Sequence, residues 1–409
     1  MSFQTGLSGL SAASQNLDVI GNNVSNSETT GFKQSRAEFA SLVASTVGQG
    51  SNNNTGLGVE VQATPQQFTQ GTLSVTGNAL DLAINGNGFF QLTLPDGSTA
   101  YTRSGNFKLD SSGDIVTNAN AKVMGFPTTT AGVTTSTTMQ ALTIPTGAPI
   151  PAQATSTITA QFNLPASATT VYNAATNTPP LTTYGTTVSV YDTQGNAVPF
   201  TMNFTRAAST PAAGAVPALD NWDVRDSAGN ALFTMSFTAN GTLYSPTTPP
   251  TVTIPSGSAV TPPISAALNV TGVTQYATSY GVTALNQNGY TAGSYVSMAV
   301  GNNGVITATY SNGQTQATGM VALADFQNNQ GLKDVGGNNW IQTAASGQPI
   351  TGQAGSGNFG AINAGTLENS NVDITAQLVD MMTAQRDYQA NAQTIKTQNQ
   401  IMQTLVNLG

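Results

Sequence analysis

The side chains most able to do acid–base chemistry in this chain are carboxylates, because its 409 residues include no histidine and no cysteine. That composition excludes thiolate nucleophiles, His-based triads and zinc sites built from Cys and His. Asp81, Asp110 and Asp114 lie near one another in the sequence, and a glycosidase needs only a pair of such groups. However, Asp110-Ser-Ser-Gly-Asp114 also has the composition of a tight turn and lacks the terminal glutamate of a calcium loop. We interpret it as a turn.

Other ligand-binding signals are equally weak. Gly86-Asn87-Gly88 lacks the third glycine and the following helix of a nucleotide-binding loop, so we interpret it as hairpin punctuation. Only 7% of the residues are charged, against about 25% in ordinary soluble proteins. The 10 basic residues are scattered among 18 acidic ones, and no apolar run approaches a membrane span. The sequence therefore predicts no enzyme, no cofactor, no nucleic-acid partner and no direct membrane insertion.

The stretch from Val372 to Leu408 contains no glycine and no proline, although the chain has 42 and 19 of them. As one helix it would span roughly 55 Å. We expect Ser370 to cap its first turn and Asp373 to favour the positive end of its dipole. An apolar seam of coiled-coil type runs along it. The seam consists of Ile374, Met381, Tyr388, Ile395 and Met402, with Leu378, Ala392 and Leu405 beside them. It is too thin to be buried alone, so this helix needs a partner.

The N-terminal segment carries a similar seam. Its apolar positions are Phe3, Leu7, Leu10, Leu17, Ile20 and Val24, and Gly6 and Gly9 weaken its start. Periodicity alone favours an ordinary amphipathic helix packed on its own domain. However, neither seam has a globular neighbour in sequence. We therefore interpret both as assembly surfaces, which pair with each other and with other copies of the chain.

The segments between the two helices alternate in composition. A stretch from Ser35 to Val47 is interpreted as a second short helix, and Gly48 to Gly58 as a flexible connector. Period-two patterns and Asn-Gly or Asp-Gly turns then indicate an antiparallel β domain from Val59 to about Phe126. Sixteen of the 19 prolines fall between Pro127 and Pro263, which marks an inserted β domain rich in loops.

The expected fold class is multidomain α+β, with long terminal α-helices that form a coiled-coil-like inner domain and two nested all-β domains. Residues 1–25 with 371–409 form the helical polymerisation domain, and 26–70 with 355–370 the connector. Residues 71–143 with 281–354 form the inner β domain, and 144–280 the inserted outer β domain.

Three groups of motifs resemble the bacterial flagellar rod and hook proteins. The first runs from Leu10 to Asn26 (LSAASQNLDVIGNNVSN) and continues in Thr30-Gly-Phe-Lys33. The second is Leu80 to Phe90 (LDLAINGNGFF) followed by Tyr101 to Phe107 (YTRSGNF). The third begins at Leu367 (LENSNVDI) and includes Met381-Met382, Gln385-Arg386 and Tyr388. The resemblance covers both ends and the inner β domain, whereas the insert carries no motif that we can match.

Within this family, the length of the chain favours a subunit of the hook, the curved tube that transmits torque from rod to filament. The resemblance implies an extracellular protein that is exported through the flagellar export apparatus without a cleaved signal peptide. The implied partners are many copies of itself, the distal rod protein, the hook cap and the hook–filament junction protein. Among the uncharged groups that could line the export channel are Gln389, Gln393, Asn399 and Gln403. A distal-rod-like axial protein and a secreted β-rich adhesin remain the alternatives.

Overall fold

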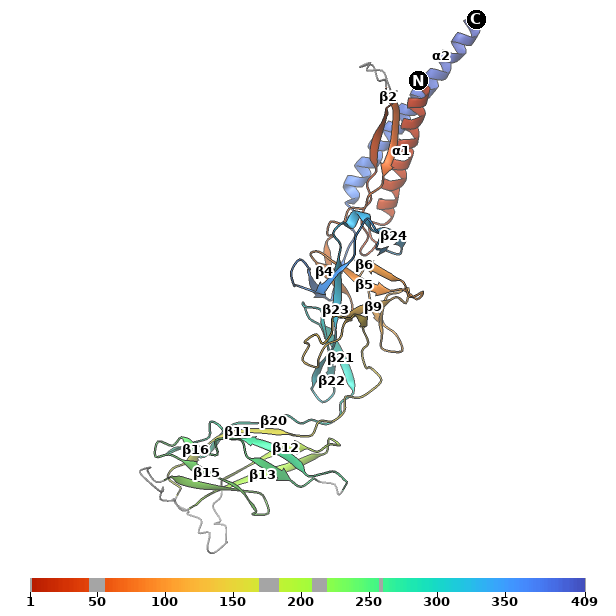
Figure 1. Cartoon of the computed structure of the whole chain (residues 1–409). Coiled ribbons are helices and arrows are strands. Elements are labelled where there is room, and N and C mark those ends of the chain that lie inside the picture. Colours follow the sequence, from red (N-terminus) through yellow and green to blue (C-terminus); the bar gives the residue numbers. More distant parts are fainter. Residues whose placement is uncertain (1, 44–55, 169–183, 208–218, 257–259, 409) are drawn as a thin grey trace. The chain divides into compact units, whose positions relative to one another are not determined.

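The computed structural model describes residues 2–43, 56–168, 184–207, 219–256 and 260–408 (Figure 1). In these ranges the chain consists mainly of strands, and its α-helices are α1 (Ser2–Ser25) and α2 (Ile374–Leu408). The terminal helices are confirmed, but the expected α+β class with a coiled-coil-like inner domain is wrong. Period-two segments with turn residues occupy most of the chain, and the helices do not form a long coiled coil.

The chain divides into two compact units. Unit 1 comprises Met1–Gly147, Val296–Thr309 and Thr315–Gly409, and unit 2 comprises Ala148–Tyr295 and Tyr310–Gln314. Both helices belong to unit 1, which therefore brings the two ends of the chain together.

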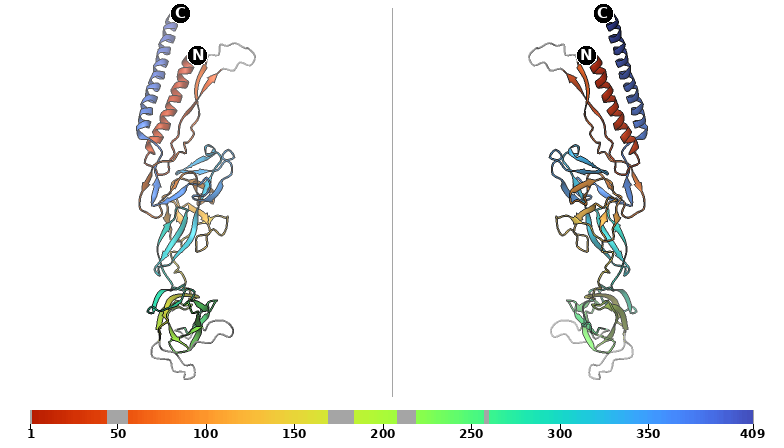
Figure 2. Two further views of the ribbon diagram at one scale, coloured as in Figure 1. Left: turned by 90° about the vertical axis from the view of Figure 1, so that its left-hand side faces the viewer. Right: turned by 90° about the vertical axis from the view of Figure 1, so that its right-hand side faces the viewer.

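A β-hairpin lies beside the two helices (Figure 2). It consists of β1 (Glu38–Val43) and β2 (Gly56–Ala63), with Phe39 opposite Val61 and Ser41 opposite Val59. The predicted helix within Ser35 to Val47 is therefore wrong, because this segment finds its partner in a strand further along the chain. Gly56 to Gly58, expected in a flexible connector, belong to β2, whereas the rest of that connector lies outside the described residues.

A twelve-stranded sheet forms the body of unit 1. Its longest strand, β23, pairs with β22, β9, β5 and β26 and so holds the sheet together. The strands are β5 (Phe89–Thr93), β6 (Thr99–Thr102), β7 (Lys108–Leu109), β8 (Ile115–Val116), β9 (Lys122–Phe126), β10 (Gln140–Ala141), β21 (Tyr295–Val300), β22 (Val305–Tyr310), β23 (Thr315–Asp325), β24 (Lys333–Gly336), β25 (Asn339–Ile341) and β26 (Ile350–Gln353). A 3₁₀ helix at Asn329–Gly331 precedes β24.

Two short strand pairs connect the sheet region to α2. They are β3 (Leu73–Val75) with β28 (Thr366–Glu368), and β4 (Leu82–Asn85) with β27 (Ala361–Ala364). The Gly86-Asn87-Gly88 segment links β4 to β5, which belong to different sheets, so its interpretation as hairpin punctuation is wrong. The segment instead meets the backbone near Gly360, where a Cβ on Gly86 would lie 2.9 Å from the Cα.

An aromatic cluster forms part of the core of unit 1. Phe89 meets Phe68, Phe326 and Trp340 edge to face, with ring centroids 5.6, 6.1 and 5.8 Å away. Trp340 also donates from Nε1 to Oε1 of Gln66 at 2.6 Å. The segment around residues 66–68, expected in a connector, is therefore packed on the sheet.

Unit 2 contains two five-stranded sheets that bury one apolar core. Phe162 and Leu268 come from one sheet, and Phe204 and Trp222 from the other. The first sheet consists of β11 (Thr157–Pro165), β17 (Thr251–Ile254), β18 (Ile264–Asn269), β19 (Thr274–Tyr276) and β20 (Gly281–Gln287). The second consists of β12 (Tyr184–Tyr191), β13 (Ala197–Arg206), β14 (Asp220–Arg225), β15 (Ala231–Phe237) and β16 (Leu243–Ser245).

Candidate assembly surface

Helices α1 and α2 lie antiparallel and side by side (Figures 1 and 2). Asn23, near the end of α1, donates from Nδ2 to Oε1 of Gln377 at 3.0 Å, near the start of α2. At the other end, Gly6 lies against Ile395. Because α2 has 35 residues and α1 has 24, the last turns of α2 extend past the start of α1.

Small residues allow the two helices to approach closely. A Cβ on Gly9 would lie 2.8 Å from Oδ1 of Asn391, and one on Gly6 would lie 3.2 Å from Cγ1 of Ile395. Ala13 of α1 and Ala384 of α2 are also buried. The interface therefore uses glycine, alanine and amides, and Gly6 and Gly9 serve as contact positions.

Polar contacts attach the β1–β2 hairpin and the segment that precedes it to α1. Nδ2 of Asn23 donates to the Ser35 carbonyl at 2.8 Å, and its Oδ1 accepts from the Ser35 amide at 2.9 Å. Near the other end of α1, Oγ of Ser8 accepts from the Val59 amide at 3.3 Å. Helix α1 is thus held between α2 and the hairpin.

Asp373, and not Ser370, caps the first turn of α2. Its Oδ1 accepts from the amides of Thr375 and Ala376 at 2.9 and 3.2 Å. Ser370 instead accepts from the Val372 amide, before the helix begins. The carboxylate also lies at the positive end of the helix dipole, as predicted.

The predicted seam of α1 is only partly covered within the chain. Ile20 is buried, whereas Leu10, Leu17 and Val24 are partly buried. Phe3 and Leu7 are exposed. The buried positions that the seam pattern missed are the small residues Gly6, Ala12 and Ala13, together with Asn23.

The predicted seam of α2 is mostly uncovered. Ile374, Leu378, Tyr388 and Met402 are exposed, at 42, 47, 38 and 56% of their full accessible area. Met381 and Ile395 are partly buried, and the side chain of Leu405 lies outside the described part of the chain. The structure therefore brings Ile395 to α1 and leaves four of the described α2 seam residues exposed. Four further large apolar side chains of α2 are exposed, namely Val379, Met382, Ile401 and Val406.

The four amides that we predicted to line a channel are all exposed on α2. At about 100° per residue, Gln389, Gln393, Asn399 and Gln403 fall within an arc of about 120°. Lys396 is exposed on the same arc, so this side of the helix carries one positive charge.

A buried ionic cluster of Lys33, Arg103 and Glu368 lies where the helices join the sheet region. Nζ of Lys33 is 2.6 Å from Oε1 of Glu368, and Nη1 of Arg103 is 3.4 Å from Oε2. The side chains of Lys33 and Glu368 are fully buried, and that of Arg103 is 6% exposed. Burial lowers the pKa of the Lys33 amine, and Glu368 acts in the opposite direction. We call these three residues the Glu368 cluster.

Sequence reasoning missed this cluster, although each of its residues lies within one of the quoted motifs. The lysine follows α1, the arginine follows β6, and the glutamate precedes α2. The sequence offers one indication of such a cluster, namely that the three charged residues belong to the quoted motifs of a chain in which only 7% of the residues are charged.

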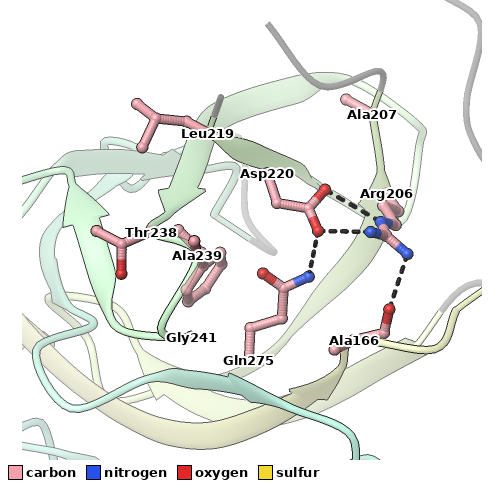
Figure 3. A pocket seen from close by; sticks show the side chains of 10 residues that line it. Ala166, Arg206, Ala207, Leu219, Asp220, Thr238, Ala239, Gly241 and Gln275 are labelled. Atoms are coloured by element: carbon pink, nitrogen blue, oxygen red, sulfur yellow. Dashed lines mark hydrogen bonds and ion pairs between the residues drawn. The ribbon is translucent and has the colours of Figure 1, made fainter. Parts of the chain in front are cut away.

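Unit 2 holds a cavity of about 490 Å³, lined in part by Arg206, Asp220 and Gln275 (Figure 3). Asp220 accepts from Nε of Arg206 at 3.1 Å and from Nε2 of Gln275 at 2.6 Å. Arg206 also donates to the carbonyls of Ala166 and Ala168. Because these charged groups already form hydrogen bonds and ion pairs with one another, they leave few polar atoms free to bind a ligand.

The candidate catalytic carboxylates are occupied in local contacts. Oδ1 of Asp110 accepts from the amides of Ser112 and Asp114, which confirms the turn. Asp114 pairs with Lys122 at 2.6 Å, and Asp81 accepts from Thr76 at 2.6 Å. Among the described residues, no group of three or more acidic side chains could hold a metal ion. No helix there is long and apolar enough to cross a membrane.

Four family models match the chain, and their descriptions all refer to the flagellum. They are a flagella basal body rod protein (residues 3–33), a flagellar hook protein FlgE/F/G D1 domain (83–169), a flagellar basal body protein FlaE D2 domain (163–290) and a flagellar basal body rod FlgEFG protein C-terminal region (363–408). These matches define the class as the structural proteins of the flagellar rod and hook.

Full-length relatives narrow the class to one protein. The flagellar hook protein FlgE of Escherichia coli (strain K12) is 39% identical over 423 residues, and that of Salmonella typhimurium is 41% identical over 418, with all of each chain covered. A crystal structure of Helicobacter pylori flagellar hook protein FlgE2 matches with a TM-score of 0.54 at 15% identity, over 71% of this chain and 99% of that chain. At that identity the match shows the fold alone. The chain belongs to the flagellar hook protein FlgE family and is a structural subunit of the hook, an extracellular part of the flagellum.

This membership confirms two predictions from the sequence. The chain belongs to a structural family, so it is not an enzyme, and it assembles with itself and with other flagellar components. The rod-like and adhesin alternatives are not favoured, because the full-length relatives are hook proteins.

Proposed function

We propose that the exposed apolar seam of α2 is the main surface through which hook subunits assemble into a tube. The observation that carries this proposal is the exposure of Ile374, Leu378, Tyr388 and Met402 on a helix of 35 residues. Several large apolar side chains exposed along one helix are uncommon on the surface of a monomer and indicate an interaction site. Burial of this surface stabilises an assembly by about 25 cal/mol per Å².

The end of α2 supports this proposal most directly. Gly6 lies against Ile395, and α1 begins only four residues before Gly6, at Ser2. Ile401, Met402 and Val406 are exposed and lie six or more residues beyond Ile395, on turns that extend past the start of α1. Helix α1 therefore cannot cover them within one subunit. In the tube, the α1 and α2 helices of neighbouring copies would cover these side chains, with Phe3 and Leu7 of α1 contributing from their side.

The amide arc in the second half of α2 would face the channel of this tube, whereas Ile374 and Leu378, which fall on the same arc near the start of the helix, would lie against neighbouring copies. Gln389, Gln393, Asn399 and Gln403 are exposed together, and neutral amides bind a passing unfolded chain only weakly because they form no ion pairs. Lys396 adds a single positive charge to that side. The tube would thus enclose an export channel while it transmits torque from rod to filament as a curved, flexible joint.

The remaining segments have separate roles in this proposal. Residues 1–25 and 371–409 polymerise, and residues 26–70 and 355–370 connect them to an inner β domain within residues 71–143 and 281–354. Residues 144–280 form an outer β domain, and β20 (Gly281–Gln287) belongs with this outer domain because it pairs with β11. The chain leaves the cell through the flagellar export apparatus without a cleaved signal peptide, and the ends of the tube meet the distal rod protein, the hook cap and the hook–filament junction protein.

Charge substitutions on α2 test the assembly surface. Leu378→Asp and Met402→Asp place a carboxylate on the seam, and Thr397→Asp places the same group on an exposed position away from it. We expect the two seam variants to lose hook assembly while their circular dichroism matches that of the control, and the control to form hooks. Normal hooks from both seam variants would overturn the proposal.

A further inference from the structure

Three segments of unit 1 meet where the helix pair joins the sheet region, and a carboxylate on one of them contacts the other two. Oε1 of Glu368 lies 2.6 Å from Nζ of Lys33, in the segment that leaves α1. The same oxygen accepts from the amide of Gly71 at 3.0 Å, in the segment that leads from the hairpin to β3. Glu368 itself belongs to the segment that enters α2.

The same carboxylate is also tied to the sheet. Oε2 of Glu368 is 3.4 Å from Nη1 of Arg103, directly after β6. The guanidinium carbon of Arg103 lies 5.3 Å from the ring centroid of Phe89, a member of the aromatic core cluster. The cluster therefore connects the helices to the aromatic core cluster of unit 1.

Backbone contacts reinforce this connection at the same place. The Gly31 amide donates to the Glu368 carbonyl at 2.8 Å. Gly31 has a φ of +71°, and a Cβ there would lie 2.6 Å from the Ser104 amide nitrogen. Asn371 adds a second link, because it accepts from the Gln34 amide at 2.8 Å and donates to the Gln67 carbonyl at 2.7 Å.

We propose that the Glu368 cluster is the joint that fixes the direction in which the helix pair leaves the sheet region, and that it thereby determines the shape of the hook. This inference rests on the proposed assembly of the tube through α1 and α2. Helix α2 is roughly 52 Å long at about 1.5 Å per residue, so a rotation of about 5° at its base moves its far end by roughly 4–5 Å. A displacement of that size approaches the pitch of one helical turn, about 5.4 Å, and shifts the seam relative to its neighbours.

Buried ion pairs fix the relative orientation of two segments better than apolar packing does, because they are directional. Such pairs add little net stability, since desolvation offsets their attraction, and in some proteins they specify one arrangement over others. The Glu368 cluster has two cations for one carboxylate, so loss of the carboxylate leaves both cations without their ionic partner. Glu368 is therefore the residue whose removal should disturb the joint most.

The test compares Glu368→Gln with Asp114→Asn in the full chain. Both changes remove one carboxylate from a 2.6 Å ion pair with a lysine in unit 1, but Asp114 pairs with Lys122 within the sheet and away from the helices. The first measurement is urea unfolding followed by Trp340 fluorescence in a Trp222→Phe background, because Trp340 belongs to the aromatic core cluster of unit 1. The second is the curvature of hooks isolated from cells that produce each variant.

We expect both subunits to fold, with a lower urea midpoint for Glu368→Gln. Hooks of Asp114→Asn should have the curvature of unmodified hooks, and Glu368→Gln should give hooks of altered or mixed curvature, or none from a folded subunit. Unmodified curvature in Glu368→Gln hooks would overturn the proposal that the cluster fixes the direction of the helices.

If Glu368→Gln does not fold, Arg103→Lys replaces it, since this change retains the charge and removes the planar contact with Phe89. Unmodified curvature in that variant would equally overturn the proposal. A failure of the proposed assembly surface gives a different result. In that case the Leu378→Asp and Met402→Asp variants would form normal hooks, whether or not Glu368→Gln changes the curvature.

Discussion

Nζ of Lys33 and Oε1 of Glu368 lie 2.6 Å apart and fully buried, although 335 positions separate the two residues in the chain. One follows the first helix and the other precedes the last, so this ion pair joins the two ends of the chain at the base of the assembly surface. Arg103 adds a second cation on the other carboxylate oxygen. The cluster therefore has two cations and one anion, so removal of the anion should destabilise the fold more than removal of one cation.

Glu368→Gln should cost more stability than Lys33→Met. Removing the carboxylate leaves buried Lys33 without an ionic partner and leaves Arg103 with only the more distant charge of Asp325, which costs about 3–5 kcal/mol. Removing the lysine leaves Glu368 paired with Arg103, so the loss should be closer to that of a charged hydrogen bond, about 1.5–3 kcal/mol. Urea unfolding followed by Trp340 fluorescence measures both values. A larger loss for Lys33→Met would contradict the contacts described for the cluster.

Gly21→Ala should stabilise α1 as helix propensity predicts, whereas Gly9→Ala should not. Alanine is favoured over glycine in a helix by about 1 kcal/mol. Gly21 has no neighbouring atom within 4 Å of an added Cβ, so Gly21→Ala should realise that gain. At Gly9 the added Cβ would meet Oδ1 of Asn391 at 2.8 Å, which should cancel the gain.

The double variant Gly9→Ala with Asn391→Ala should recover much of the gain, because the shortened side chain makes room. Helicity during thermal unfolding, followed by circular dichroism, distinguishes the three variants. Equal gains at Gly9 and Gly21 would show that the helices do not approach as closely in solution.

The helices were predictable because their signals are local. The absence of glycine and proline from Val372 to Leu408 is enough to predict α2, and its observed start at Ile374 differs by only two residues. The cap was assigned to Ser370 because both Ser370 and Asp373 have the chemistry, and only the geometry of the first turn shows that Asp373 accepts from its amides.

The features that sequence reasoning missed depend on partners far along the chain. Phe39 and Leu42 fit a helical spacing, but Phe39 pairs with Val61 in a hairpin. Burial of Glu368 could not be foreseen, because a carboxylate is buried only where cations from distant segments meet it. Helix propensity predicts only that Gly9 weakens α1, whereas the structure shows that Gly9 makes room for Asn391 of α2.

Acid should destabilise unit 2 through Asp192, whose side chain accepts from Asn196. The hydrogen bond from the Asn196 side chain, aided by the backbone amides of Asn196 and Gln194, lowers the pKa of Asp192 below its ordinary value of 3.8, against the effect of burial. A carboxyl with a lowered folded pKa contributes stability that is present above its unfolded pKa and lost as the pH falls through the folded value. Stability should therefore decline below about pH 3.8.

Fluorescence of Trp222 in a Trp340→Phe background follows this decline, because Trp222 is buried in the core of unit 2. Asp192→Asn should be less stable at neutral pH and should show a weaker decline in acid. An unchanged acid dependence in Asp192→Asn would exclude this carboxyl as a cause.

A charge at Gln403 should slow filament growth. No charged residue lies within four positions of Gln403 on α2, so Gln403→Glu places an uncompensated carboxylate on the proposed channel wall. Each ion pair with a passing chain is worth about 1 kcal/mol at 4 Å in water and more in a narrow channel. Gln62→Glu, an exposed site on β2, makes the same change elsewhere. Equal filament lengths at fixed times in the two variants would argue against the channel position of Gln403.

The most direct test of the assembly surface is a cryo-EM reconstruction of hooks built from this chain. The measurement is the accessible area of Ile374, Leu378, Tyr388 and Met402, which are exposed in the single subunit. We predict that neighbouring copies bury all four side chains and that Gln389, Gln393, Asn399 and Gln403 line the channel. If the four apolar side chains are still exposed in the tube, α2 is not the assembly surface.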